Sequence, residues 1–149
     1  MNRKLKDLGF EAVRVGSQSK YIVVDDLGVI TFSGSLRREL GIKRRESAVI
    51  YFNGGEGVLG IHVGTFDRKK NREMAIINIS SEWTISAREE LMAIEDEHRG
   101  YRLIAEEGKR NNFDDVEVEN FTEPPDPYSR MVLVTIKKER VSFRDGGIR

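Results

Sequence analysis

Five cationic side chains crowd one short stretch of this sequence, and their types suit the binding of phosphate groups. They are Arg37, Arg38, Lys43, Arg44 and Arg45. Each phosphate that such cations neutralise releases counterions, so binding to a nucleic acid weakens steeply as salt rises. Arginine can also donate two hydrogen bonds to the edge of a guanine. The stretch is therefore a candidate site for nucleic-acid phosphates, and the competing interpretation is a charged surface that merely faces water.

The other residue types that support catalysis or metal binding form no recognisable set. The chain has no cysteine, which excludes a thiol nucleophile and a disulfide framework. His98 lies beside three consecutive carboxylates, residues 95–97, which would point around a helix and not toward one ion. The glycine-rich residues 53–57 lack the lysine and the following helix of a phosphate-binding loop. We expect no enzyme activity, no metal and no cofactor.

The elements around the cations begin with two short strands and a helix. Runs rich in β-branched residues at 21–24 and 29–32 predict strands, with a turn sequence between them. A serine can then cap a short helix in which Leu36 and Leu40 share one face, and Gly41 should end it. This arrangement places Arg37 and Arg38 on the helix.

A β-hairpin is expected after the helix. Residues 48–52 and 58–63 are rich in β-forming residues and flank an Asn-Gly turn. Together, residues 1–66 read as one hairpin domain. Within this domain, a first strand in residues 10–15 would precede the strand at residues 21–24.

The second part of the chain, residues 74–145, reads as a β-α-β unit. Strands are expected at 74–79, 101–105 and 131–136, and Ser86 should cap a helix over residues 87–97. Residues 106–129 are acidic and rich in turn formers, which predicts a loop.

An internal repeat is an open possibility. Residues 37–40 and 88–91 have similar sequences and each lie between strand patterns. The predicted fold class is α+β, with short antiparallel strands and two short helices forming a swapped-hairpin domain or a small cradle-like barrel.

Residues 21–63 resemble the AbrB/MazE-type swapped-hairpin domain. The resemblance rests on the Leu27-Gly28 turn, the helix sequence LRRELGI at residues 36–42, and the hairpin that follows without a gap. It implies a homodimer that binds double-stranded DNA, as a transcriptional regulator or antitoxin does, with Arg37 and Arg38 facing the DNA. Members of that family often have an arginine after the turn glycine and a proline before the helix, where this chain has Val29 and Ser33.

Charge and composition leave a second class of function open. The chain has no net charge, but residues 1–50 carry ten Lys/Arg against six Asp/Glu, a surplus of +4. The acidic second half could instead dock a partner, as in a small virus-encoded inhibitor of a host protein. Trp83 and the aromatic residues that flank the acidic stretch would then either contact that partner or anchor their own loops. No apolar run is long enough for a membrane span, and we expect a cytoplasmic protein.

Overall fold

The computed structural model describes residues 5–9, 19–41, 46–66, 68–69, 72–120 and 130–138. Within these residues the protein is α+β, and all pairings between its nine short strands are antiparallel. The elements are η1 (Leu5–Leu8), β1 (Ile22–Asp25), β2 (Val29–Phe32), α1 (Gly34–Leu40), β3 (Ser47–Asn53), β4 (Val58–Gly64), β5 (Ile76–Asn78), β6 (Thr84–Ser86), α2 (Arg88–Glu97), β7 (Arg110–Phe113), β8 (Val116–Asn120) and β9 (Arg130–Thr135). The predicted α+β class, with short antiparallel strands and two short helices, is confirmed.

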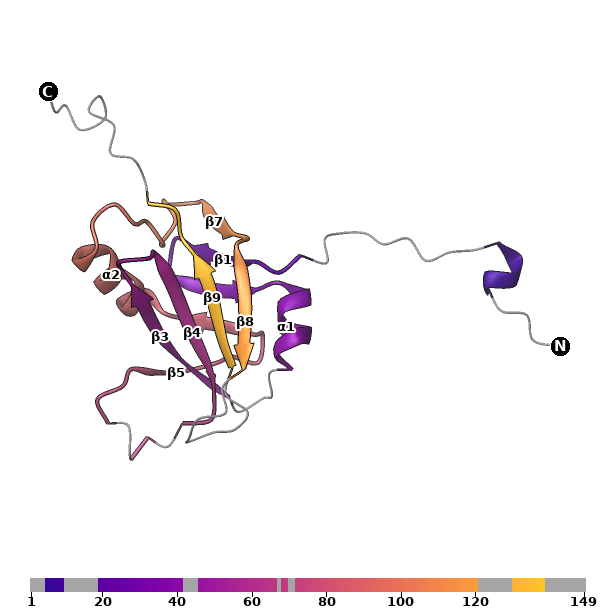
Figure 1. Cartoon of the computed structure of the whole chain (residues 1–149), viewed down its shortest axis with the longest axis horizontal. Coiled ribbons are helices and arrows are strands. Elements are labelled where there is room, and N and C mark those ends of the chain that lie inside the picture. Colours follow the sequence, from indigo (N-terminus) through magenta and orange to yellow (C-terminus); the bar gives the residue numbers. More distant parts are fainter. Residues whose placement is uncertain are drawn as a thin grey trace, which may run out of the picture.

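The strands form two open sheets, and no closed barrel is present among the described residues. One sheet has the order β6-β2-β1-β7, and the other has the order β5-β3-β4-β9-β8. Each sheet combines strands from residues 1–66 with strands from residues 74–145, so the two segments interleave. Figure 1 shows α1 and α2 on opposite sides of the molecule.

One apolar core joins the two sheets. Ile22, Val24 and Ile30 from the first sheet belong to the same buried cluster as Ile61 and Val132 from the second. In β1, β2 and β9 the buried side chains alternate with more exposed ones, as expected when one face of a sheet is buried. The interleaved strands therefore share a single hydrophobic core.

Local signals explain α1, which carries the candidate site. Ser33 has extended backbone angles, and its hydroxyl accepts a hydrogen bond from the Leu36 amide, so it is the N-cap. Gly41 ends the helix in the left-handed conformation with φ 57°, and its amide donates to the Arg37 carbonyl. Leu36 and Leu40 are buried on the inner face. All of these features agree with the sequence predictions.

The hairpin predicted after α1 is confirmed. β3 and β4 pair along their whole length, from Ser47 opposite Gly64 to Asn53 opposite Val58. The Asn53 side chain accepts hydrogen bonds from the amides of Gly55 and Glu56, which stabilises the turn.

Three predictions for the second half of the chain were wrong. Residues 101–105 form no strand, although Leu103 is buried, because the Leu103 amide bonds to the Glu95 carboxylate instead of to a sheet. Residues 106–129 are not one loop, since β7 and β8 lie within them. The N-cap of α2 is Ala87 and not Ser86, which is the last residue of β6.

Some predicted features lie outside the described residues. They are the strand within residues 10–15, residues 121–129 of the acidic loop, and residues 139–145 of the second unit. No helix in the described ranges combines the length and the apolar character needed to cross a membrane.

An approximate two-fold relation links the two halves of the fold. β2 pairs with β6 and β4 pairs with β9, each in an antiparallel manner. If β6 corresponds to β2 and β9 to β4, then β7 and β8 together take the place of β3. β8 pairs with β9 as β3 pairs with β4, and β7 pairs with β1 as β3 pairs with β5. Ile30 lies opposite Ile85 at the centre of this relation, and Leu36 and Leu91 are the matching buried residues of the two helices.

The turns before β2 and β6 have the same hydrogen bonds. The Asp25 carboxylate accepts from the amides two and four residues later, at 2.9 Å each. The Ser80 hydroxyl accepts from the amides two and four residues later, at 3.2 and 3.1 Å. Gly28 and Trp83 then occupy the same left-handed position, with φ 75° and 64°. Matching the turns pairs Leu36 with Leu91, so the alignment of residues 37–40 with 88–91 that the sequence suggested is one helical turn out of step.

Candidate nucleic-acid interface

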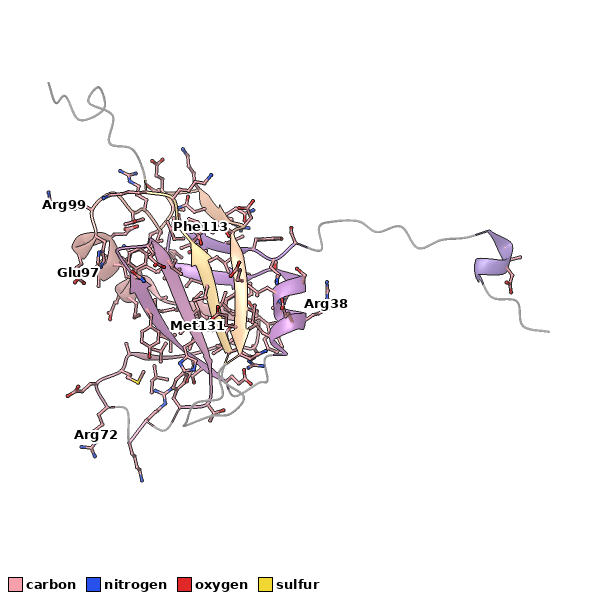
Figure 2. The ribbon with its side chains drawn as sticks, in the orientation of Figure 1. Arg38, Arg72, Glu97, Arg99, Phe113 and Met131 are labelled. Carbon is pink, nitrogen blue, oxygen red and sulfur yellow. The ribbon has the colours of Figure 1, made fainter. Side chains whose placement is uncertain are left out.

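The structure places two of the five candidate cations. Arg37 and Arg38 lie in the last turn of α1, and Arg38 is exposed. Figure 2 shows the Arg38 side chain projecting from α1 on the side of the molecule opposite Glu97 and Arg99. Lys43, Arg44 and Arg45 lie outside the described residues.

The guanidinium groups of Arg37 and Arg38 converge at the start of their own helix. A methyl group built on Gly34 would lie 3.6 Å from Nη1 of Arg38 and 3.9 Å from Nη2 of Arg37. Both cations therefore reach the same small region beside Gly34, where the helix has no side chain. Two positive groups held this close attract an anion more strongly than either does alone.

A hollow of approximately 320 Å³ opens at this place. Its lining residues are Gly34, Arg37, Arg38, Gly41 and Trp83. The helix α1 supplies one wall, and the turn between β5 and β6 supplies the Trp83 side chain. The hollow therefore combines two guanidinium groups with one large aromatic ring.

Trp83 has an unusual backbone conformation. It is the one residue other than glycine with positive φ in the described part of the chain, at 64°. A bulky residue in this region is strained by about 1–3 kcal/mol, and such strain tends to occur at functional sites. The turn holds Trp83 there, because its amide donates to the Ser80 carbonyl at 3.0 Å and the Ser80 hydroxyl bridges to Thr84 at 2.7 Å.

The two carboxylates near the basic stretch are engaged elsewhere. Glu39 forms an ion pair with Lys20 at 3.0 Å, and Glu46 pairs with Arg130. Neither Arg37 nor Arg38 forms an ion pair with any residue that the structure describes. The Nε atom of Arg37 is buried and has no hydrogen-bond partner within the same residues. No ion pair among the described residues therefore neutralises the positive charge of Arg37 and Arg38.

The corresponding place on α2 has a different character. Gly28, the counterpart of Trp83, packs directly on α2, where a Cβ atom would lie 2.6 Å from the Arg88 Cα. Met92 and Ala93 follow the buried Leu91 as Arg37 and Arg38 follow Leu36, and the exposed Asp96 and Glu97 make this side acidic. The hollow with two arginines thus belongs to one half of the fold.

The other side chains considered for catalysis or metal binding either have structural partners or do not converge on one point. The Asp25 carboxylate stabilises its own turn, and Asp26 accepts a hydrogen bond from the Gly108 amide at 2.9 Å. His98 packs against Phe52, with ring centroids 5.0 Å apart. Among the residues described, no group of three His, Asp or Glu side chains is arranged to hold a metal ion.

A second hollow, of approximately 350 Å³, mixes charges of both signs. Arg102 and Lys137 line it together with Asp114 and Asp115. It therefore has no strong preference for an anion or a cation, unlike the hollow beside α1.

The sequence pointed to Arg37 and Arg38 but not to Trp83 as their neighbour, because Trp83 stands among the aromatic residues that flank the acidic stretch. No local signal could have joined Trp83 to α1, since the contact depends on the pairing of β6 with β2. The resulting arrangement can hold a negatively charged group between the two guanidinium groups, with an aromatic residue beside it. Comparisons with protein-family models, with curated proteins and with solved structures find no match to this chain.

Proposed function

We propose that this protein binds DNA through the outer side of α1, as a transcriptional regulator or antitoxin would. The observation that carries the proposal is the convergence of Arg37 and Arg38 beside Gly34, with no carboxylate among the described residues to neutralise them. Arginine pairs of this kind suit phosphate oxygens, because each planar guanidinium can donate two parallel hydrogen bonds. The resemblance of residues 21–63 to the AbrB/MazE-type domain supports the same proposal.

The turn between β1 and β2 is less suited to contact DNA. Its backbone is hydrogen-bonded to the second half of the chain, since the Gly28 carbonyl accepts from the Ala87 amide at 3.0 Å and the Asp25 carbonyl accepts from the Ala105 amide at 3.2 Å. Because Val29 stands in place of an arginine, this turn carries no cationic side chain. The proposed contact therefore rests on α1.

A salt titration tests the proposal. We expect labelled duplex DNA to bind at low salt, and the double variant Arg37→Gln/Arg38→Gln to bind at least tenfold more weakly. The slope of log K against log salt should fall by about 0.9 for each phosphate contact that is lost, or nearly 2 for both. Glutamine keeps most of the side-chain length, so packing against Arg37 changes little.

The matched control is Arg72→Gln/Arg99→Gln. Both of these arginines are exposed and lie away from α1, so the control removes the same net charge from another part of the surface (Figure 2). If the two double variants lose affinity equally, binding depends on total charge and the proposed site is wrong. If neither the parent protein nor its variants bind DNA, the proposal fails altogether.

The alternative proposal is a protein-interaction module, such as a small viral inhibitor of a host protein. Exposed acidic side chains on α2 and β8 support it, with Asp96 and Glu97 on the helix and Glu117 and Glu119 on the strand. Met92 is 42% exposed among the acidic residues of α2 and could be the apolar centre of such a surface. This alternative gains support if DNA is ignored and substitutions on α2 abolish capture of a partner protein.

A further inference from the structure

We propose that the hollow beside α1 accepts a nucleotide whose base is unpaired. The base would stack on Trp83, and its phosphate would lie between Arg37 and Arg38. This inference rests on the proposed function, because Arg37 and Arg38 would hold a phosphate in both, and it goes beyond that function by adding a preference for an unpaired base. The ligand chemistry is a planar aromatic ring joined to a phosphate, which a free nucleotide and a single strand both provide.

The conformation of Trp83 supports this role. The matching turn has Gly28 at the same left-handed position, where glycine is free of strain. A tryptophan there needs the Ser80 turn to hold it, and its side chain remains partly exposed in the hollow while packing against the core. A glycine would satisfy the backbone at this position without strain, so the presence of tryptophan points to a contribution from its ring.

The two kinds of side chain in the hollow match the two parts of a nucleotide. Proteins that bind single strands combine cations along the backbone with aromatic rings on which bases stack. The faces of paired bases are covered by their neighbours in a duplex, whereas an unpaired base can present a face to Trp83. A hollow of approximately 320 Å³ lies at the small end of the usual range for ligand pockets, which suits one nucleotide and not a longer segment.

The asymmetry of the fold indicates one such site in the described part of each chain. At the related place on α2, glycine replaces the tryptophan and Met92 and Ala93 replace the two arginines. The contact between Gly28 and Arg88 also leaves no room for a side chain there. We expect one nucleotide to bind per chain.

The intrinsic fluorescence of the protein reports on this site directly, because Trp83 is the single tryptophan of the chain. The full chain is titrated with adenosine monophosphate, with a ten-nucleotide single strand, and with the matching duplex. We expect quenching by the single strand with an affinity about tenfold higher than that of the duplex. Quenching by the mononucleotide with equal affinity identifies a free nucleotide as the ligand. A duplex that binds as well as the single strand, with no quenching by either, overturns the inference.

Substitution of the ring separates this inference from the proposed function. Trp83→Leu should weaken the binding of a labelled single strand about tenfold, measured by anisotropy, and leave duplex binding within twofold. If Trp83→Leu has no effect while Arg37→Gln/Arg38→Gln still abolishes binding, the site binds phosphates alone and this inference fails. If the arginine variant also has no effect, the proposed function fails with it.

A charge placed inside the hollow gives a test that does not depend on the ring. In Gly34→Asp the new carboxylate would lie beside both guanidinium groups, and an acidic residue in the first turn of a helix stabilises that helix. We expect binding of the single strand to fall more than tenfold while the melting temperature stays equal or rises. Gly55→Asp adds the same charge to the exposed β3–β4 turn and is the matched control. Equal losses in the two variants would contradict the site.

Discussion

The turns before β2 and β6 differ in the residue at their left-handed position, which is Gly28 in the first turn and Trp83 in the second. Both residues end the same kind of turn, with φ 75° and 64°. Glycine allows its turn to press against the first residue of α2, whereas tryptophan lines an open hollow beside α1. The difference between the two sides of the molecule therefore depends strongly on these two positions.

Substitution of Gly28 tests the close contact with α2. In Gly28→Ala the new Cβ would lie 2.6 Å from the Cα of Arg88, so the backbone of one element must move. We expect the free energy of unfolding to fall by about 2–4 kcal/mol, from the positive φ together with overpacking. Urea denaturation measures this loss.

Gly108→Ala is the matched control for this prediction. Gly108 has the same φ of 75°, but a Cβ there would meet nothing within 4 Å. It should cost about 1 kcal/mol from backbone strain alone. Losses of the same size in the two variants would mean that the Gly28 turn can move away from α2 at little cost.

At the scale of elements, β9 fixes the end of α1 through Arg130. Its guanidinium donates to the Leu40 carbonyl at the C-terminus of the helix and forms an ion pair with Glu46. The two side chains of this pair are 13% and 10% exposed, so both charges are largely removed from water. A cation at this end also interacts favourably with the helix dipole. The pair therefore helps to hold α1, and with it the hollow, against the sheet.

Removal of one partner of this ion pair should be costly. Arg130→Met leaves the Glu46 carboxylate buried without its partner, and we expect a loss of about 3–5 kcal/mol in the free energy of unfolding. The double variant Arg130→Met/Glu46→Leu should recover most of that loss, because no unpaired charge then remains. A thermodynamic cycle in urea measures both values. A single variant within 1 kcal/mol of the parent would show that the pair is exposed to water in solution.

For the molecule as a whole, each half of the chain completes the sheets of the other. A chain that contained only the swapped-hairpin domain would need a second copy of itself to cover its strand edges. Here β6 covers β2 and β9 covers β4, so the second half of the same chain meets that need. Strand pairing within the described residues therefore does not require the homodimer that the resemblance implies, and we predict a monomer instead.

Two measurements on chain and fragment test this interleaving. We expect light scattering to give the mass of one chain for the full protein, and a fragment of residues 19–66 to be unfolded or to form a dimer. That fragment lacks β5, β6, β7 and β9, so a folded monomer would leave both edges of the β1–β2 pair and both edges of the β3–β4 pair uncovered. A folded monomeric fragment would therefore disprove the interdependence of the halves. A full chain with twice the expected mass would show that a further surface pairs two copies.

The sequence alone determined the elements from β1 to β4 and the two cations on α1. The strands β1 and β2, the Ser33 cap, the Gly41 end and the β3–β4 hairpin all follow from signals within a few residues of each other. Such signals act through local backbone preferences and local hydrogen bonds, which are present in the sequence whatever surrounds it. For the same reason, Arg37 and Arg38 could be placed together on one short helix.

The tertiary structure decided the rest. β7 has the polar sequence RNNF, which has little strand preference, and it is a strand because β1 lies beside it. Leu103 has a strand-like sequence around it but bonds to Glu95 instead. Trp83 joins the arginines because the pairing of β6 with β2 carries its turn to the side of α1. Contacts between residues so far apart in sequence depend on the packing of the whole chain, and no local pattern encodes them.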